Sequence, residues 1–486
     1  MTLDDGSALV LDAGGQAGLS LVRSLGRKGV AVTAGSTERF SLGRLSRHST
    51  GGYRYPEPEA DGRRFLDHLV EYLETHDRSV VFPTRDSTSA LCARHKPELE
   101  ATGTTVAVED WDTFERAYDK GALFELAATL PVDTPTTVAP TSPAAVADLA
   151  DEVPYPAVVK PRSKTLWDDD GRCHVTLVDD AHYVASPEEL VPAYEALLAR
   201  NPALEREAHY PLVQEYVPGT TTTTVVLADA GEVLLHFQEE RVRTYPDSGG
   251  SSTLLRPLRD DDMLAAAETV IGALEWTGPA MVEFMRRPDG SHALIEVNGR
   301  YWGSVPFAIQ SGVDVPWQHY RLLRGLGVDA TDYTRPVPLF HRLLYGDLKW
   351  LAEQVRAGNP AAVATVAWTC LVAKQAFVST EDPVPTLAAV AEGQDGRARG
   401  RTGRAPGGRR HVGVGEHAAV RRVHRRADAV NRAGTTPTAS AATRPPWRPH
   451  RRSRSRALSD AIRSAVGGCV RKSHRSSACS RFRSHQ

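Results

Sequence analysis

Two acidic segments late in the sequence carry the residue types best suited to holding a divalent metal ion. Glu283 lies in the apolar run AMVEFM, and Glu296 and Asn298 lie in LIEVNGR. Residues two apart in a strand project from the same face, so Glu296 and Asn298 should point to one place. Two carboxylates and an amide oxygen suit Mg²⁺, which keeps its other positions for water and phosphate oxygens. Solvated acids on edge strands are the alternative interpretation.

Three other segments carry groups that could contact a nucleotide. Arg300 follows the second acidic segment, and its guanidinium suits a transferred phosphoryl group. Lys160 ends the apolar run AVVK, although a surface lysine before a proline is the simpler interpretation of that residue alone. The segment VQEYVPG at 213–219 passes from a strand into a Pro-Gly turn. Backbone groups around Glu215 to Val217 could pair with adenine there.

Taken in order, a lysine after a buried strand, QEYVPG, VEF and IEVNGR resemble the ATP-grasp superfamily. The closest likeness is to carboxylate–amine ligases similar to the ATP-binding domains of the carbamoyl-phosphate synthase large chain. The resemblance covers about residues 8–390 and includes Tyr118-Asp-Lys120, which looks like the start of the nucleotide fold. It implies that Mg·ATP phosphorylates a carboxylate and that an amine then attacks the acyl phosphate; Mn²⁺ could replace Mg²⁺. Phosphorylation without ligation is the alternative within the superfamily.

The resemblance implies a role for each matching residue. The phosphates of ATP would contact Lys120 and Lys160, and adenine would contact Gln214, Glu215 and the backbone of Val217. One or two Mg²⁺ ions would bind Glu283, Glu296 and Asn298. The transferred phosphoryl group would contact Arg300, and Arg241 would bind substrate or phosphate beside a loop at 245–252. Further candidates are Lys164, Arg243 and Arg256. A run of threonines at 220–224 leaves the ribose contact unassigned.

The elements that must position these residues begin with an α/β unit. The apolar run 8–12, a glycine-rich turn, a helical pattern and the apolar run 30–33 predict a parallel, Rossmann-like sheet. The turn GGQAG lacks the GxGxxG spacing and no acidic residue ends the second strand, so a tight turn is favoured over a dinucleotide site. Thr84, Arg85 and Asp86 follow a strand at 78–83, at the edge where ligands gather in such sheets.

The remaining pattern predicts α/β and α+β architecture in four parts. Residues 1–105 would form a Rossmann-like pre-ATP-grasp domain and residues 106–330 the ATP-grasp domain. Its strands are expected at 157–160, 212–217, 223–227, 233–237, 278–284 and 292–298, with a hairpin turn at 229–232. Residues 331–392 read as mainly helical, and residues 393–486 as a disordered Arg-rich tail.

Charge divides the chain at the same boundary. Residues 393–486 hold 23 Lys and Arg against 4 Asp and Glu, a net charge of about +19. The first 392 residues hold the other 35 Lys and Arg and 56 Asp and Glu, a net charge of about −21. An acidic, lysine-poor body resembles proteins of a high-salt cytoplasm. The abrupt change suggests a shifted reading frame after about residue 392, with a genuine basic arm as the alternative. Such an arm could attract nucleic acid, which is a rival function, but it holds few aromatic residues.

The other compositional features favour a cytoplasmic enzyme. Five scattered cysteines without CxxC pairs indicate neither a zinc site nor a disulfide framework. No signal peptide is visible before the first apolar run, and the most apolar later stretch, 361–378, is too short and mixed to span a bilayer. The expected partners are therefore a small-molecule carboxylate, an amine and a second copy of the chain, with no membrane and no nucleic acid.

Overall fold

The computed structural model describes residues 6–391 except 169–170, 177, 179–181, 246–250, 332, 334–335 and 343. The predictions made for residues 393–486, disorder and a shifted reading frame, lie outside the described residues. So does most of the loop expected beside Arg241.

The first part of the chain forms a five-stranded parallel sheet in the order β3-β2-β1-β4-β5. Its strands are β1 (Ser7–Val10), β2 (Ala31–Ser36), β3 (Gly51–Arg54), β4 (Val80–Phe82) and β5 (Thr105–Val106). The helices are α1 (Gln16–Arg27), α2 (Leu42–Leu45), α3 (Gly62–Thr75), α4 (Asp86–Arg94) and α5 (Lys96–Glu100). The strand order reverses between β1 and β4, and in such sheets ligands bind outside the carboxyl ends of the strands at this point.

The first strand is shorter than predicted, because the chain turns early. Asp12 adopts a left-handed conformation with φ 56°, and its buried carboxylate accepts hydrogen bonds from Tyr55 (3.0 Å) and Thr88 (2.6 Å). Helix α1 then begins so close to this turn that a Cβ on Gly18 would lie 2.6 Å from the carbonyl oxygen of Asp12. The glycines here serve a tight turn.

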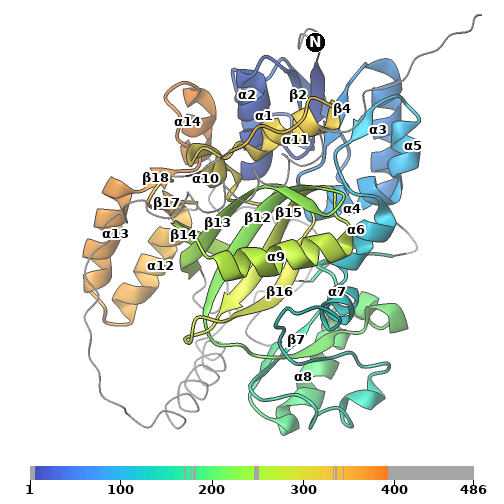
Figure 1. Ribbon diagram of the computed structural model, residues 1–486, viewed down its shortest axis with the longest axis vertical. Helices are drawn as coiled ribbons and strands as arrows, with labels where there is room; N and C mark the ends of the chain where they lie inside the picture. Colours follow the sequence, from blue (N-terminus) through green and yellow to red (C-terminus); the bar gives the residue numbers. More distant parts are fainter. Residues whose placement is uncertain are drawn as a thin grey trace, which may run out of the picture. The chain divides into compact units, whose positions relative to one another are not determined.

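A small antiparallel sheet, in the order β10-β7-β11-β6, follows. Its strands are β6 (Thr137–Val138), β7 (Ala157–Lys160), β10 (Tyr183–Val184) and β11 (Leu212–Glu215). Helix α8 (Pro187–Arg200) lies beside β7 (Figure 1) and buries Leu190 and Tyr194 against Val159 and Val213. Helices α6 (Trp111–Tyr118) and α7 (Lys120–Ala127) precede the sheet, and the hairpin β8 (Thr165–Trp167) and β9 (Cys173–Val175) follows β7.

A seven-stranded sheet forms the centre, in the order β16-β15-β12-β13-β14-β17-β18. Its long strands are β12 (Thr220–Asp229), β13 (Glu232–Tyr245), β14 (Ser251–Leu258), β15 (Gly278–Arg286) and β16 (His292–Asn298). Helix α9 (Asp261–Leu274) crosses one face (Figure 1). The predicted hairpin turn is confirmed: Asp229 pairs with Glu232 around Ala230 (φ 47°) and Gly231 (φ 85°), the conformation of a two-residue hairpin.

The last part is less uniformly helical than predicted. Helices α10 (Val305–Gln310), α11 (Val315–Leu323), α12 (Leu344–Arg356), α13 (Ala361–Val372) and α14 (Pro383–Ala391) are joined by two short strands, β17 (Phe340–His341) and β18 (Lys374–Gln375). These strands extend the central sheet by pairing with β14 and with each other. Single 3₁₀ turns occur at Ala144–Val146, Pro202–Leu204 and Glu207–His209. Among the described residues, no helix is both long and apolar enough to cross a bilayer.

Candidate active site

The structure brings the three predicted metal ligands together on one face of the central sheet. Glu283 of β15 pairs directly with Glu296 of β16. The Asn298 amide donates hydrogen bonds to the carboxylates of Glu296 (3.0 Å) and Glu283 (3.4 Å). Alternation along the strand explains this arrangement, because Val282, Phe284 and Val297 point to the opposite face and pack in the core beneath α9.

Two lysines converge on the same carboxylate from outside the sheet. The ammonium of Lys164 lies 2.8 Å from Glu296 Oε1 and 2.9 Å from Asn298 Oδ1. The ammonium of Lys120 lies 3.3 Å from Glu296 Oε2. Burial alone would raise the pKa of Glu296, but Lys164 and Lys120 hold it well below its usual range. The carboxylate of Glu296 is therefore ionised, as a ligand of a metal ion must be. The two ammonium groups beside it could pair with phosphate.

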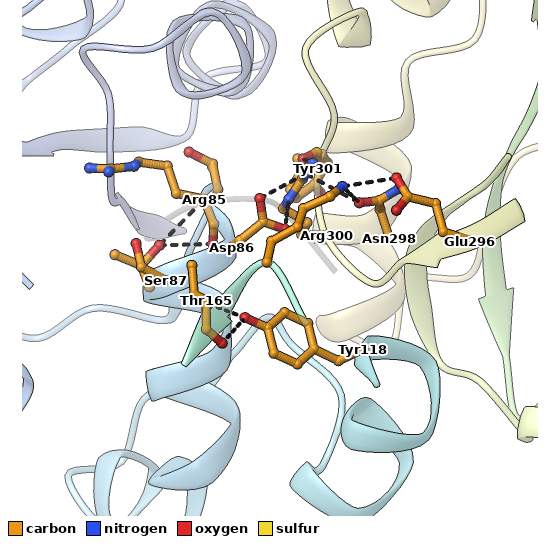
Figure 2. Close-up of polar contacts among 12 residues, drawn as sticks. Arg85, Asp86, Ser87, Tyr118, Thr165, Glu296, Asn298, Arg300 and Tyr301 are labelled. Carbon is orange, nitrogen blue, oxygen red and sulfur yellow. Dashed lines mark hydrogen bonds and ion pairs between the residues drawn. The ribbon is translucent and has the colours of Figure 1, made fainter. Parts of the chain in front are cut away.

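The loop after β7 places the two lysines side by side. The backbone N–H of Lys120 donates to the carbonyl of Arg162 (3.0 Å), and Arg162 pairs with Asp119 (2.9 Å). Tyr118 donates to the carbonyl of Thr165 (3.0 Å) (Figure 2). These contacts fix the start of α7 against the segment that carries Lys164.

Arg300 joins the site to the parallel sheet. Its guanidinium donates to both carboxylate oxygens of Asp86, at 2.6 and 2.9 Å, and to Asn298 Oδ1 at 3.3 Å. Figure 2 shows Asp86, Arg300, Asn298 and Glu296 in succession. Burial opposes charge on Asp86, yet Arg300 and Lys164 lower the pKa of this carboxyl. A small pocket lies here; among its lining residues are Asp86, Tyr118, Lys120, Lys164, Glu296 and Arg300.

The residues predicted to contact phosphate and adenine form a second group in the small sheet. The ammonium of Lys160 lies 2.7 Å from the side-chain oxygen of Gln214, whose amide donates to Thr137 (2.8 Å). The carboxylate of Glu215 accepts from the backbone of Thr136 (3.1 Å), and Val217 is buried. Burial and the neighbouring Lys120 lower the pKa of Lys160 to about 8.

The three arginines near the predicted acceptor loop have different surroundings. Arg241 donates to Glu283 at 2.7 Å and so belongs to the site. Arg243 instead pairs with the fully buried Asp347 of α12 at 2.9 Å and stacks on Trp350. Arg256 is half exposed and pairs with Glu240 at 2.6 Å. The structure thus brings only Arg241 to the carboxylates.

The donor set suits magnesium with phosphate better than a closed protein cage. Within the described part of the chain, no cluster of three or more His, Cys, Asp or Glu side chains is placed to hold a metal ion. The predicted ligands are two carboxylates and one amide oxygen, so an ion here would need further oxygens from phosphate and water. The surrounding lysines and arginines suit those phosphates.

Two residues of this cluster were not assigned by the sequence. The sequence identifies Asp86 only as one of three polar residues that follow a strand. Its partner Arg300 lies 214 positions away in the chain, so no local pattern could connect the two. Glu239 lies in the HFQEER segment, buried on the same face of the sheet as Glu283. The signal for Glu239 was present, since Phe237, Glu239 and Arg241 alternate along one strand.

Known structures share this fold at low sequence identity. The biotin carboxylase domain of 2-oxoglutarate carboxylase from Hydrogenobacter thermophilus, a dimer in complex with MgADP, ADP and bicarbonate, has a TM-score of 0.54 and 18% identity, over 68% of this chain and 73% of that chain. The L-amino acid ligase from Bacillus licheniformis has a TM-score of 0.51 and 16% identity, over 70% and 79%. The N5-carboxyaminoimidazole synthetase from Staphylococcus aureus, complexed with ADP, has a TM-score of 0.54 and 14% identity, over 74% and 87%.

Neither a protein-family model nor a curated protein matches the sequence. The similarity to known structures therefore lies in the path of the chain. This similarity agrees with the resemblance inferred from the sequence. The chain has the ATP-grasp fold.

Proposed function

We propose that this chain is a Mg·ATP-dependent ligase that activates a carboxylate as an acyl phosphate and joins it to an amine. One observation carries the proposal: Glu283, Glu296 and Asn298 share one face of adjacent strands, and Lys120, Lys164 and Arg300 surround them. Oxygen donors beside cations are what a nucleotide triphosphate with its metal requires. The ligases and carboxylases of similar fold support the same reaction class.

The proposed roles are those that the resemblance to ATP-grasp enzymes implies. Lys120 and Lys160 hold the ATP phosphates, while Gln214, Glu215 and Val217 hold adenine. Glu283, Glu296 and Asn298 hold Mg²⁺, which when bound neutralises phosphate charge. Arg300 and Arg241 stand on either side of these ligands and stabilise the charge of the transferring phosphoryl group. Positioning and electrostatics supply most of the catalysis in such transfers.

The organisation of the chain is part of the proposal. Residues 1–105 form a Rossmann-like pre-ATP-grasp domain, 106–330 the ATP-grasp domain and 331–392 a C-terminal region that closes one edge of the central sheet. The enzyme acts in the cytoplasm on small molecules. A homodimer is the proposed assembly, since one protein of similar fold is a dimer.

Coupled ADP release tests the proposed function. The full chain would be incubated with Mg·ATP in high-salt buffer, with pools of carboxylates, and with or without amines. Release that requires both an acid and an amine is the expected result. The double variant Glu296→Ala/Asn298→Ala should abolish it, whereas Glu240→Gln, which removes a charge from the opposite face of β13, should not.

Two other outcomes would contradict the ligase. ADP release that needs an acid but no amine, with a stable phosphorylated product, indicates phosphorylation without ligation. Failure to bind Mg·ATP in a direct titration removes the nucleotide site altogether. Binding with no turnover in any pool excludes the tested acids and amines as substrates.

A further inference from the structure

A third carboxylate lies in line with the two predicted metal ligands. Glu296 pairs with Glu283, Glu283 pairs with Thr223 of β12, and Thr223 pairs with Glu239 of β13. These four residues therefore form one row across four strands and share one face. Glu239 stands two strands from Glu283, a backbone separation of about 10 Å at the usual strand spacing. That distance separates it from the predicted metal ligands but leaves it on the same face of the sheet.

Glu239 is buried, with 4% of its surface exposed. Within the part of the chain that the structure describes, only one of its two carboxylate oxygens has a hydrogen-bond partner. One oxygen accepts a hydrogen bond from the hydroxyl of Ser304 at 2.5 Å, and the other has no hydrogen-bond partner among the described residues. A buried polar atom without a partner destabilises the fold, so its presence calls for an explanation.

Arg342 and Gln16 each hold another buried atom without a hydrogen-bond partner among the residues that the structure describes. Arg342, whose guanidinium packs on Gly303, has a buried Nε without a hydrogen-bond partner in the described part of the chain. Gln16 donates to the carbonyl of Arg342 at 2.8 Å, but its own side-chain oxygen is likewise unsatisfied. Arg342 interacts electrostatically with Glu239, so a carboxylate and a guanidinium that each lack one hydrogen-bond partner among the described residues lie near each other.

The surroundings set the proton affinity of Glu239 near neutrality. Burial raises its pKa to about 7, with Glu283 acting in the same direction, while the Ser304 hydroxyl, Arg342 and Arg241 oppose the rise. The groups facing it are thus two cations, one hydroxyl and one carboxylate. A carboxyl group that changes protonation near neutral pH is matched to proton transfer.

We propose that Glu239 accepts a proton from the ammonium form of the acceptor amine. The inference rests on the proposed ligase function. One proton passes from nitrogen to the carboxylate, giving a neutral amine and a carboxylic acid. The nitrogen lone pair then attacks the acyl carbon, the C–N bond forms, the C–O bond to phosphorus breaks, and phosphate leaves. The second proton lost from nitrogen goes to the departing phosphate or to solvent.

A comparison of two nucleophiles separates proton acceptance from a structural role. Hydroxylamine is largely unprotonated near neutral pH and needs no base, whereas methylamine is almost wholly protonated. With ATP and each proteinogenic L-amino acid as the carboxylate, Glu239→Gln should form hydroxamate within about threefold of the unsubstituted chain but lose methylamide formation by about 100-fold or more. Equal loss with both nucleophiles, or loss with neither, overturns the proposal.

The controls keep the two proposals distinguishable. Glu240→Gln, next in sequence but on the other face, should change neither reaction. Absence of hydroxamate from the unsubstituted chain with every acid would exclude amino acids as the carboxylate, and an infrared titration of the full chain would then test the proton acceptor by itself. Hydroxamate without methylamide in the unsubstituted chain would contradict only the proton acceptor.

A spectroscopic measurement tests the inference without any substrate. Infrared difference spectra of the full chain should show a carboxylic acid band that disappears as the pH rises through about 7. The band should be missing from Glu239→Gln and present in Glu240→Gln. Ser304→Ala, which removes the hydrogen bond that favours the carboxylate, should move the midpoint to higher pH. A titration unchanged in Glu239→Gln would assign the band to another group and overturn the proposal.

Discussion

Asp86 and Arg300 form a two-point ion pair between the first turn of α4 and the end of β16, with N–O distances of 2.6 and 2.9 Å. Arg300 also donates to Asn298 Oδ1, so the parallel sheet and the central sheet hold the same guanidinium. Burial opposes charge on Arg300, but Asp86 raises its pKa. The parallel sheet therefore helps to orient the arginine proposed to meet the phosphoryl group.

Replacing Asp86 should reduce the rate more than nucleotide affinity. Asp86→Asn leaves the guanidinium with a weaker partner and freer to rotate, so we expect kcat to fall about 10- to 100-fold, as when a positioned group is lost. Kd for Mg·ATP, measured by titration calorimetry, should change by less than about threefold. Asp112→Asn removes an exposed acid from the first turn of α6 and serves as the control. A proportional loss of affinity would contradict a positioning role.

Lys164 should compete with metal binding, because its ammonium contacts both Glu296 and Asn298. Lys164→Met removes this cation, and we expect the affinity for Mn²⁺ without nucleotide to rise about 10-fold, equivalent to about 1.4 kcal/mol. Electron paramagnetic resonance of free Mn²⁺ measures the change. Lys160→Met is the matched control, because Lys160 contacts Gln214 rather than the carboxylates. Unchanged or weakened Mn²⁺ binding in Lys164→Met would rule out the competition.

The pKa of Lys160 gives nucleotide binding a pH dependence. Burial and Lys120 lower this pKa to about 8, from 10.5. The ammonium is lost as the pH rises through about 8, so Mg·ATP affinity should fall between about pH 7 and pH 9, with proton uptake on binding. Calorimetry in buffers of different ionisation heat measures that uptake, and Lys160→Gln should abolish it. An affinity that holds to about pH 10 would mean that the ammonium does not contact phosphate.

The lowered pKa of Lys160 makes the free energy of unfolding rise with pH, whereas it makes the affinity for Mg·ATP fall. A lysine with a lowered folded pKa disfavours the folded state while both states are protonated, below about pH 8. That penalty disappears as the pH rises from about 8 to 10.5, so the contribution of Lys160 to the free energy of unfolding increases over this window.

Local pattern predicted the strands of the site well. The strand 292–298 was predicted at its observed bounds, and the alternation of Glu296 and Asn298 placed both on one face. Lys160 ends β7 as expected. These features depend on a few neighbouring residues, whose apolar and polar alternation is strong enough to define a strand and its face.

Contacts between segments that are far apart in the chain could not be predicted from the sequence. Nothing near Arg300 indicates that its partner is Asp86, and nothing near Lys164 indicates that it reaches Asn298. The two strands β17 and β18 were read as part of a helical region, because two residues are too few to set a period. Tertiary packing decides such short elements.

Gly18 offers a test of the tight-turn interpretation of GGQAG. A Cβ at this position would meet the backbone of Asp12 and Ala13 at 2.6 and 2.7 Å, and backbone cannot move as a side-chain tip can. Gly18→Ala should therefore lower the free energy of unfolding by about 1–3 kcal/mol, the usual cost of overpacking. Gly15→Ala, where the nearest atom is at 3.5 Å and φ is −87°, should have little effect. Chemical denaturation compares the two variants, and equal stability would contradict the argument.

Asp382 connects the C-terminal region to helix α1 and to the segment that follows α2. Its carboxylate, 1% exposed, accepts from Arg23 (2.8 Å), Ser46 (2.7 Å) and the backbone of Arg47 (3.0 Å). Asp382→Ala leaves the buried Arg23 unpaired, and breaking such a pair costs about 3–5 kcal/mol of unfolding free energy. Glu381→Ala, whose side chain is 70% exposed, should cost less than about 1 kcal/mol.

The pH dependence of the Asp382 contribution distinguishes an ion pair from simple packing. Burial opposes charge on Asp382, but hydrogen bonds from Arg23, Arg47 and Ser46 lower its pKa below 3.8. A carboxyl with a lowered folded pKa stabilises the fold above its unfolded value, and that stability is lost as the pH falls through the folded pKa. The stability difference between the unsubstituted chain and Asp382→Asn should thus be constant near neutral pH and shrink below about pH 4. A difference that persists in acid would assign the effect to packing, because a protonated Asp382 and an asparagine are both uncharged.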